Sequence, residues 1–405
     1  MEGRHPQWPE GVKMFRGLQR SDTQCPEGTA GPSCALKGIK MAFIHNAIMP
    51  YRRPFFERLD LQYDMDLILV DPGVTTSVYG VAGDDGQLRP TVLTGPLKYI
   101  RMARALLRGE YDIIVDSLER RSILSFLISR VTGIPVLYWS EEWGEGKAGL
   151  ANSLLFPLSK FVARHADGVL VPGSNHKAYF VGNGVAEDRI TVMPNASNME
   201  FRPLGDVKRS ELKAELNIGE KSVILYVGRL VRQKGVEYLL QALSEMPPTW
   251  VLVVVGEGEN KVSLVRLSQK LGIADDVRFL GRVDNEDLFR YYHLSDVVVV
   301  PSTTIGGLND AWVFVLNEAM LFGRAVIATK AVGAAPDMVV EGENGFIVPE
   351  RDALSLRKAL ERTIVDGESE RMGKKSSERI SHFTYDTMVD AFDRAVAKIH
   401  GDSKC

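Results

Sequence analysis

The chain has 405 residues, a length that suits two domains of about 150–200 residues each better than one. It is 45% hydrophobic and 25% charged, so it can build cores and stay dissolved, and its net charge of −3 gives no electrostatic reason to expect nucleic-acid binding. Its three cysteines, Cys25, Cys34 and Cys405, lie near the ends without metal-ligand spacing, and no run of about 20 apolar residues occurs, which speaks against a disulfide framework, a zinc site and a transmembrane span.

The first 37 residues differ from the rest of the chain. They contain four prolines and five glycines and show no periodicity, so we predict a disordered N-terminal extension over residues 1–37. A charged stretch followed by an apolar one, the pattern of a secretion signal, does not occur there. We therefore expect a cytoplasmic protein.

From residue 39 onward, short apolar runs alternate with longer amphipathic patterns, which predicts parallel strands connected by helices. The strands predicted for the first half are residues 39–45, 66–70, 112–115, 135–139 and 168–172. Helices are predicted over residues 97–108 and 121–131. This alternation predicts a Rossmann-like domain over residues 38–200.

The alternation restarts after residues 195–221, a polar stretch that we interpret as the joint between two domains. Strands are predicted over residues 223–227, 250–255, 277–280, 297–300, 325–328 and 346–348, and helices over residues 236–243, 261–271, 286–293 and 313–322. A second Rossmann-like domain is thus expected over residues 201–380. The last predicted helix, residues 385–400, falls in the segment 381–405, which we expect to pack back on the N-terminal domain.

A glycine and two cations follow the strand predicted over residues 223–227. Gly228 permits a close backbone approach, Arg229 offers a bidentate fork and Lys234 a point charge, ahead of a helix whose first amides are free. This combination suits a diphosphate. Taken alone, however, it is more often a basic turn at the surface, since charged turns are common.

Gly256 and Gly258 follow the next predicted strand and precede a helix. They form a shortened dinucleotide fingerprint, because Lys261 stands where the third glycine is required. A tight turn is therefore the simpler interpretation, and a dehydrogenase is disfavoured.

The most informative run follows the strand predicted over residues 297–300. Residues 310–320 read Asp-Ala-Trp-Val-Phe-Val-Leu-Asn-Glu-Ala-Met. The run resembles the Glu-x7-Glu motif of retaining GT-B glycosyltransferases of family 4, in which many members read Glu-x-Trp-Gly-Leu-Val-x-Asn-Glu-Ala-Met. The resemblance extends over essentially all of residues 223–360, through Gly323, residues 326–328 and 332–335, Gly342, residues 344–346 and Pro349.

The resemblance implies an α/β fold of the GT-B type, two doubly wound Rossmann-like domains that face a central cleft. It implies that residues 38–200 bind the acceptor and residues 201–380 bind the nucleotide sugar. The implied reaction moves a hexose from a UDP- or GDP-linked donor to a glycan or a lipid-linked acceptor, with retention of the anomeric configuration. No cofactor and no metal ion are expected.

The motif also implies residue roles. Arg229 and Lys234 would neutralise the departing diphosphate, Glu318 would accept hydrogen bonds from the ribose hydroxyls, and Asp310 would bind the sugar and stabilise positive charge on the anomeric carbon. We therefore predict that Asp310, Arg229 and Lys234 are catalytic. The predicted donor contacts are Gly228, Arg229, Lys234, Gly256, Val283, Asp310, Trp312, Val313, Phe314, Val315 and Glu318, with the backbone amides near residues 313 and 314 as an anion cradle.

Two positions depart from the family pattern. Asp310 stands where the family has Glu, and Val313 stands where it has Gly. Capping of the following helix is the alternative role for Asp310, because Asp is a good N-cap residue. The alternative for Glu318 is an ordinary surface carboxylate. Both departures keep a second hypothesis open, a non-catalytic GT-B-like subunit that binds nucleotide sugars, whereas an epimerase lacks an identifiable acid/base pair.

The sequence gives less information about the residues that bind the acceptor. Residues 46–52 resemble the first loop of some family members and end in Arg52, and Glu141 and Glu142 follow a predicted buried strand. The glutamates could orient an acceptor hydroxyl, and Trp139 and Trp143 could stack on a sugar ring. A solvated acidic loop beside core aromatics fits the same residues equally well. We take Arg52, Glu141 and Glu142 as acceptor-binding candidates.

The helix predicted over residues 97–108 carries four cations and several apolar residues in an amphipathic pattern. Such a helix can lie on an anionic membrane surface, which would suit a lipid-linked acceptor and a site at the inner face of the cell membrane. An ordinary surface helix of a soluble domain is the competing interpretation. Asp64 and Asp66 mimic a metal-binding Asp-x-Asp, but the surrounding pattern is wrong and we expect a loop there.

Overall fold

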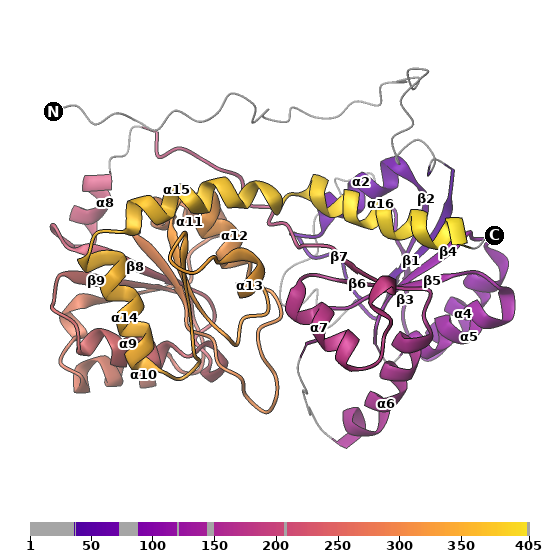
Figure 1. The fold of residues 1–405 in the computed structure, drawn as a ribbon, viewed down its shortest axis with the longest axis horizontal. Coiled ribbons are helices and arrows are strands. Elements are labelled where there is room, and N and C mark those ends of the chain that lie inside the picture. The colour runs from indigo at the N-terminus through magenta and orange to yellow at the C-terminus, as the bar shows by residue number, and fades with distance from the viewer. Residues whose placement is uncertain are drawn as a thin grey trace.

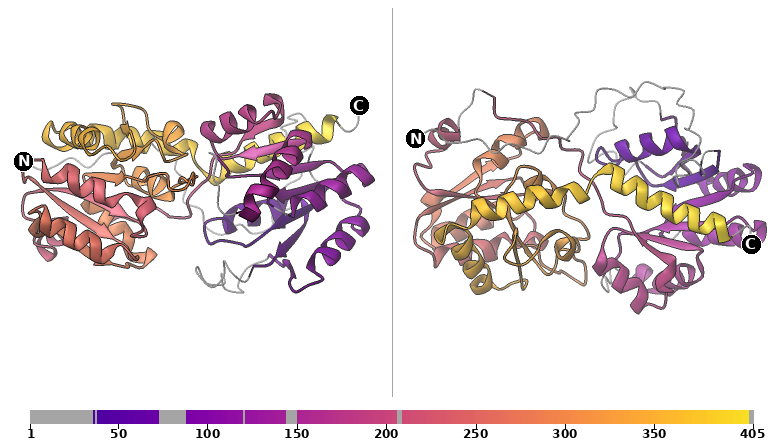
Figure 2. Two further views of the ribbon diagram at one scale, coloured as in Figure 1. Left: turned by 90° about the horizontal axis from the view of Figure 1, so that it is seen from below. Right: turned by 45° about the horizontal axis from the view of Figure 1, so that its top comes forward.

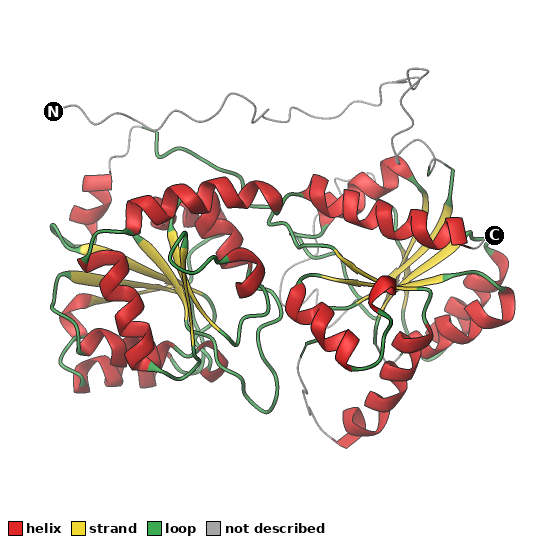
Figure 3. Cartoon of the chain, viewed as in Figure 1, coloured by secondary structure: helices red, strands yellow, loops and turns green. Residues whose placement is uncertain are grey.

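The computed structural model describes residues 36, 38–72, 88–119, 121–143, 150–205 and 209–402, with only the backbone described at 150–157 and 402. The extension predicted over residues 1–37 lies outside this range except for Leu36, which is buried against the first sheet. The described chain forms two lobes, and each is a sheet covered by helices (Figures 1 and 3).

Seven parallel strands form the sheet of the N-terminal lobe, in the order β3-β2-β1-β4-β5-β6-β7. The strands are β1 (Lys40–His45), β2 (Asp64–Val70), β3 (Thr91–Leu93), β4 (Ile113–Ser117), β5 (Val136–Trp139), β6 (Gly168–Val171) and β7 (Ile190–Val192). The helices that connect them are α2 (Arg53–Gln62), α4 (Lys98–Arg108), α5 (Ser122–Thr132), α6 (Leu150–His165) and α7 (Ser174–Gly182). The strand order changes direction between β1 and β4: β2 and β3 follow on one side of β1, and β4 to β7 follow on the other.

Six parallel strands form the sheet of the C-terminal lobe, in the order β10-β9-β8-β11-β12-β13. The strands are β8 (Ser222–Val227), β9 (Trp250–Val255), β10 (Val277–Gly281), β11 (Val297–Val300), β12 (Ala325–Thr329) and β13 (Gly345–Val348). The helices are α8 (Arg209–Glu215), α9 (Val236–Ser244), α10 (Lys261–Lys270), α11 (Asn285–Leu294), α12 (Phe314–Leu321), α13 (Ala335–Met338), α14 (Ala353–Leu360) and α15 (Ser369–Arg379). Here the order reverses between β8 and β11.

Both sheets are therefore doubly wound, which confirms the predicted pair of Rossmann-like domains. The strands form because their runs are rich in Val, Ile and Leu, and such runs suit a sheet that is buried on both faces. All six residues of β9 and all four of β11 are buried. The loop expected at Asp64 was wrong, since β2 starts there and pairs in parallel with β1 from Lys40, whereas Asp66 lies in β2 as the strand predicted over residues 66–70 requires.

Each sheet has one apolar cluster on each face. The last helix, α16 (Tyr385–Asp402), follows α15 across from the C-terminal lobe and lies along the N-terminal lobe (Figure 2). Its apolar face, including Met388, Phe392 and Val396, belongs to the same cluster as β1 and α2. Hydrogen bonds of 2.6 Å from Tyr63 and Gln62 to Asp393 hold it there.

Candidate functional site

The boundary between the lobes is formed by segments that follow the carboxyl ends of strands. Trp143, after β5, donates from its indole nitrogen to the carbonyl oxygen of Asp310 over 3.3 Å. Ser174, after β6, donates its backbone amide to the carboxylate of Asp337 over 2.9 Å. Because open α/β sheets bind ligands at these strand ends, where the strand order reverses, this boundary is the candidate site.

On the C-terminal lobe, two glycines bring the ends of β8 and β9 together. Gly256 has a φ of +142°, and a side-chain carbon there would lie 1.9 Å from the carbonyl oxygen of Gly228. No larger residue fits without moving the backbone. Close packing of the two turns thus explains why Gly256 is a glycine.

Asp310 lies beside the end of β11 and is held by two side chains. Its two carboxylate oxygens each lie 2.9 Å from Nζ of Lys234, and the hydroxyl of Ser302 donates to one of them. Helix capping is not its role, because α12 starts at Phe314 with Val313 in the N-cap position. The structure therefore brings two of the three predicted catalytic residues, Asp310 and Lys234, into one half-buried ion pair.

Arg229, the third predicted catalytic residue, is exposed at the end of β8. Within the described part of the chain, no ion pair or hydrogen bond engages its guanidinium. Its backbone carbonyl is fixed by the hydroxyl of Tyr226 at 2.9 Å. The backbone of Arg229 is thus anchored while its charge is available to an anion.

Helix α12 begins beside the Asp310 pair. The backbone amides of Phe314 and Val315 fall in its first turn and have no intrahelical acceptor, as at any helix start. Val313 has a φ of −111°, an extended conformation that valine adopts readily, so the departure from glycine introduces no backbone strain. Val283 and Trp312 are half-buried against the core of this lobe.

Glu318 lies on α12 and is half-buried. One of its carboxylate oxygens accepts a hydrogen bond of 2.5 Å from the hydroxyl of the buried Tyr292. Burial raises the pKa of Glu318, and hydrogen bonds from Tyr292 and Ser197 act in the opposite direction. A free surface carboxylate does not describe this residue, because a dedicated buried phenol orients it.

On the N-terminal lobe, Arg52 is the centre of a polar network. Its guanidinium donates to Nε2 of His45 over 2.7 Å and to the carboxylate of Glu141 over 2.8 Å, and it lies over the ring of Trp139 at 4.3 Å. Asn195 donates to the same Glu141 oxygen over 2.8 Å. Burial, with a further contribution from the Arg52 charge, holds the pKa of His45 well below its usual range, so the imidazole is neutral.

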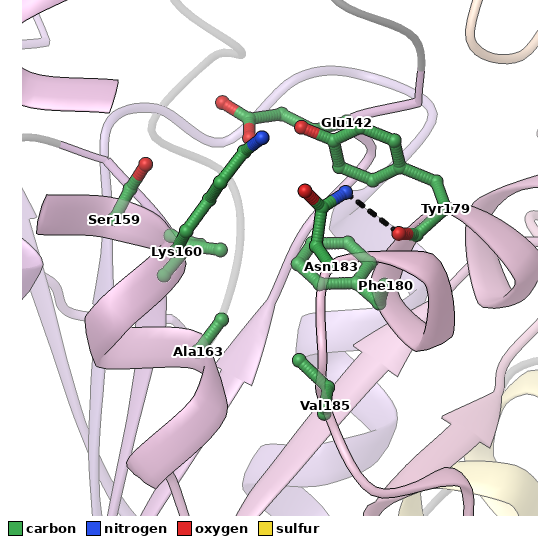
Figure 4. A pocket seen from close by; sticks show the side chains of 9 residues that line it. Glu142, Ser159, Lys160, Ala163, Tyr179, Phe180, Asn183 and Val185 are labelled. Carbon is green, nitrogen blue, oxygen red and sulfur yellow. Dashed lines mark hydrogen bonds between the residues drawn. The ribbon is translucent and has the colours of Figure 1, made fainter. Parts of the chain in front are cut away.

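The two glutamates therefore differ. Glu141 joins the network, whereas Glu142 is exposed and lines a small hollow between α6 and α7, of about 230 Å³ with open solvent included (Figure 4).

Trp139 is 3% exposed, so the expectation that its ring could stack on a sugar was wrong. Among the described residues, no cluster of three or more His, Cys, Asp or Glu side chains could hold a metal ion.

Both halves of the chain match known families. The family described as Glycosyl transferases group 1 matches residues 208–379, and the one described as Glycosyl transferase 4-like domain matches residues 60–196. Together these matches cover most of both lobes, while β1, the segment with Arg52 and α16 lie outside them.

Curated relatives carry related descriptions. A D-inositol 3-phosphate glycosyltransferase of Corynebacterium diphtheriae is 31% identical over 228 residues, which cover 53% of this chain and 51% of that protein. The match thus spans about half of that relative. The protein of the same description from Mycobacterium ulcerans is 26% identical over 384 residues, which cover 90% of this chain and 81% of the relative. A GDP-mannose-dependent alpha-(1-6)-phosphatidylinositol monomannoside mannosyltransferase of Mycolicibacterium smegmatis is 30% identical over 178 residues, 43% of this chain and 46% of that protein.

Solved structures share the two-lobed architecture. Anabaena Alr3699/HepE in complex with UDP superposes with a TM-score of 0.69 at 18% identity, over 89% of this chain and all of that one. Sucrose-phosphate synthase from Thermosynechococcus elongatus superposes with a TM-score of 0.68 at 22% identity, over 90% of this chain and all of that one. The chain is a glycosyltransferase with the GT-B fold.

The boundary site of this glycosyltransferase includes side chains that sequence reasoning did not single out. Asn317 accepts from the indole of Trp312 over 3.0 Å and donates to the backbone carbonyl of Asn195, on the other lobe, over 3.1 Å. Tyr292 orients Glu318. The sequence signal for Asn317 was its place in the motif beside Glu318, whereas nothing in the sequence pattern links Tyr292 to this site.

Proposed function

We propose that this glycosyltransferase is a retaining enzyme of family 4. It moves a hexose from a nucleoside-diphosphate sugar to a glycan or a lipid-linked acceptor, without a metal ion and in the cytoplasm. One observation carries the proposal: Arg229 follows the carboxyl end of β8, and Asp310, the first-turn amides of α12 and Glu318 follow that of β11, the two strands between which the strand order reverses. That set offers positive charge for a diphosphate and carboxylates for hydroxyl groups.

The donor's diphosphate lies against the exposed guanidinium of Arg229 and the α12 amides, because both offer hydrogen-bond donors that the protein leaves free. Glu318 accepts from the ribose hydroxyls. Its orientation is supported by Tyr292, which donates to one of its carboxylate oxygens. Asp310 accepts from hydroxyls of the transferred sugar.

Lys234 acts through an exchange of partners. In the absence of donor, its ammonium group is neutralised by Asp310 at 2.9 Å. A diphosphate brings a second, stronger negative charge to the same ammonium, so that Lys234 is shared and the Asp310 carboxylate gains freedom to accept from the sugar. Donor binding thereby prepares the sugar contact.

In the transfer step the bond between the anomeric carbon and the diphosphate oxygen breaks, and the acceptor oxygen forms the new bond on the same face. The acceptor's proton passes to the departing phosphate oxygen, so no protein base is required. Positive charge on the anomeric carbon is stabilised by the nearby carboxylate of Asp310, and negative charge on the diphosphate by Arg229 and Lys234. Retention of configuration follows from attack on the face that the phosphate leaves.

The donor's base is uracil or guanine. The structure of Anabaena Alr3699/HepE was solved with UDP and with UDP-glucose, and the related mannosyltransferase of Mycolicibacterium smegmatis is described as GDP-mannose-dependent. The same relative is described as acting on a phosphatidylinositol mannoside, which supports a lipid-linked acceptor here.

A second candidate function is nucleotide-sugar binding without catalysis. It is favoured by the full engagement of Asp310, whose shorter carboxylate is held by Lys234 and Ser302. Under this alternative the ion pair persists when donor is bound, and the transferred sugar finds no catalytic carboxylate.

A donor panel tests the proposal. The full chain is mixed with UDP-glucose, UDP-galactose, GDP-mannose and ADP-glucose, and melting temperature and nucleotide release are measured. One nucleotide family should raise the melting temperature and release nucleoside diphosphate, since a ligand that binds only the folded state stabilises it. NMR of the product should show the donor's anomeric configuration.

Four variants sharpen the panel. Arg229→Ala and Glu318→Ala should abolish the thermal shift, whereas Arg232→Ala and Glu286→Ala, exposed residues of the same charge nearby, should keep it. Nucleotide binding that ignores Arg229→Ala and Glu318→Ala would contradict the proposed site. Binding without release from any donor, unchanged by Asp310→Glu, would instead support the non-catalytic alternative.

The exposed face of α4 supports a contact with the membrane surface. Arg101, Arg104 and Arg108 are exposed and, in the described part of the chain, form no ion pair, whereas Lys98 pairs with Asp71. Ile100, which is 65% exposed, lies on the same face together with Leu97 and Leu107. No helix in the described residues is long and apolar enough to cross a bilayer. Basic and apolar groups on one exposed helix face suit the surface of an anionic membrane.

Vesicle co-sedimentation tests this contact. The protein should bind vesicles of phosphatidylserine and phosphatidylcholine and ignore pure phosphatidylcholine. Arg101→Glu with Arg104→Glu should weaken binding at least tenfold, since each cation near an anionic surface contributes about 1 kcal/mol. The matched control reverses two cations on α10, Arg266→Glu with Lys270→Glu, and equal loss in both pairs would show that only net charge matters.

A further inference from the structure

Trp143 and His176 form an aromatic pair on the N-terminal lobe, at its boundary with the C-terminal lobe. Their ring centroids lie 6.0 Å apart. His176 is fully buried, and neither of its ring nitrogens has a hydrogen-bond partner among the described residues. Burial lowers the pKa of His176 to about 4 against a smaller opposite effect of Glu141, so the ring is neutral. The pair thus offers an uncharged surface to the other lobe.

Gly333 of the C-terminal lobe lies directly on this pair. A side-chain carbon at position 333 would lie 2.4 Å from the carbonyl oxygen of Ala311 in the same lobe, and 2.7 Å from Cε1 of His176 and 2.8 Å from Nε1 of Trp143 on the other lobe. Such distances are closer than van der Waals contact permits, so a larger residue would disturb both the backbone of its own lobe and the approach of the two lobes. The amide of Gly333 in turn donates to the carbonyl oxygen of Asp310 over 2.7 Å.

The carbonyl oxygen of Asp310 consequently receives two hydrogen bonds, one from each lobe. Gly333 supplies the first, and the indole nitrogen of Trp143 supplies the second over 3.3 Å. The amide of Asp310 donates to the carbonyl of Ala331 over 3.1 Å. The backbone at Asp310 is therefore fixed from its own lobe at two points and from the N-terminal lobe at one.

We propose that Trp143 is a positioning residue for Asp310, acting across the boundary between the lobes. The inference rests on the proposed role of Asp310 as the carboxylate that binds the transferred sugar. Asp310 has one side-chain carbon between its backbone and its carboxylate, so a shift of the backbone moves the carboxylate by a similar distance. The indole of Trp143 holds that backbone in place when the lobes are in contact.

A second contact at the same boundary supports this arrangement. The carboxylate of Asp337, on the C-terminal lobe, accepts from the amide of Ser174 over 2.9 Å and from its hydroxyl over 3.1 Å. Ser174 is the first residue of α7, and the N-cap residue, Gly173, has no side chain to cap the helix. Asp337 thus caps a helix of the other lobe, which brings His176, two residues further on, against Gly333.

The consequence is that the sugar contact depends on the acceptor lobe. When the lobes separate, the Trp143 bond to Asp310 is lost and the backbone at Asp310 keeps only the contacts of its own lobe. Nucleotide contacts, at Arg229 and Glu318, do not involve Trp143. The proposal therefore separates recognition of the nucleotide from recognition of the sugar.

Calorimetric titration of Trp143→Phe tests this separation, because phenylalanine keeps an aromatic ring beside His176 and removes the N–H donor. Affinity for the nucleotide sugar and kcat should each fall about three- to tenfold, the size of one neutral hydrogen bond, while affinity for UDP or GDP alone changes less than twofold. In an Asp310→Ala background, Trp143→Phe should have no further effect on affinity for the nucleotide sugar.

Two further variants complete the test. Asn175→Ala removes the 3.5 Å contact with the Gly333 carbonyl without touching Asp310, and its affinity for the nucleotide sugar should stay within twofold of wild type. Gly333→Ala should exceed the effect of Trp143→Phe, because the added carbon would also displace the Ala311 carbonyl next to Asp310. Unchanged sugar affinity in Trp143→Phe, or a loss that persists in Asp310→Ala, overturns the positioning role. A wild-type protein that binds no nucleotide sugar overturns the proposed function instead.

Discussion

Near the boundary, the two lobes differ in whether their charged groups are paired. On the C-terminal lobe, Arg229 is exposed with its charge unused, and the first amides of α12 have no intrahelical acceptor. On the N-terminal lobe, Arg52 and Glu141 neutralise each other, and Asn195 binds the same carboxylate. At the boundary, Arg229 of the C-terminal lobe therefore leaves its positive charge available to an anion, whereas Arg52 of the N-terminal lobe is neutralised by Glu141.

This difference separates ligand affinity from stability. Substituting an unpaired charged group should change ligand binding and leave the free energy of unfolding nearly unchanged. Substituting a member of a satisfied network should leave a buried partner unpaired and lower the free energy of unfolding. The following predictions test that separation, from the largest expected effect to the smallest.

Asp310→Ala should lower the rate of sugar transfer by at least about 10²-fold, because a preorganised charge aimed at the reacting centre is removed. Binding of UDP or GDP should persist, and it should tighten, because Lys234 loses the carboxylate that neutralises it. Transfer assays and calorimetry measure the two effects. Equal loss of transfer and of nucleotide binding would mean that Asp310 belongs to a structural ion pair only.

Acid should destabilise the protein through His176. Its pKa in the folded state is about 4, below the ordinary 6.5, so between these values the unfolded chain takes up a proton that the folded chain refuses. The free energy of unfolding therefore falls as the pH drops through this window, by at most about 3 kcal/mol. Urea unfolding at about pH 7.5 and pH 5 should show a smaller difference in His176→Phe than in wild type, and equal differences would contradict the assignment.

Arg52→Ala should lower the free energy of unfolding by about 2 kcal/mol, since Glu141 and His45 lose their partner in a largely buried setting. Arg229→Ala should change it by less than about 0.5 kcal/mol, because an exposed cation without a partner contributes little. Chemical denaturation of the two arginine variants, side by side, measures the contrast. Similar changes in the free energy of unfolding for both variants would contradict the difference between the two arginines.

Tyr292→Phe should weaken nucleotide binding about three- to tenfold, because the hydrogen bond that orients Glu318 is lost. The pKa of Glu318 should rise further, since that bond favours the charged carboxylate. Titration of the nucleotide at several pH values measures both changes. Phe322, stacked on Tyr292 at 5.5 Å, offers a control in Phe322→Leu, which keeps the phenol and should retain affinity.

Sequence patterns predicted the strands best where every residue is apolar. The predicted bounds of β9 and β11 match the structure, since a parallel strand covered on both faces requires a continuous apolar run. The two strands of three residues, β3 and β7, were not predicted, and β3 has Thr91 and Val92 exposed at the edge of its sheet. Strands so short leave no periodicity to detect.

In the candidate site, too, the sequence predicted some features and not others. The motif gathered Asp310, Trp312 and Glu318 because they are close in the sequence. The pairing of Asp310 with Lys234 spans 76 residues, and its contact with Trp143 spans 167 residues and crosses between lobes. A single sequence carries no signal for such contacts, because they arise from the topology of two sheets and from the way the lobes meet.

The path of the chain has a mechanical consequence. It passes from the first lobe to the second after Asn195 and returns through Phe383 into α16, so two covalent connections join the lobes. Asn317 binds the Asn195 carbonyl beside the outward passage, and Trp312 packs on Phe383 beside the return. Two connections define a hinge axis. We expect the lobes to rotate relative to each other about this axis more readily than in other directions. A cut in the backbone between α15 and α16 would remove one of these two connections while leaving the proposed nucleotide contacts within the C-terminal lobe in place.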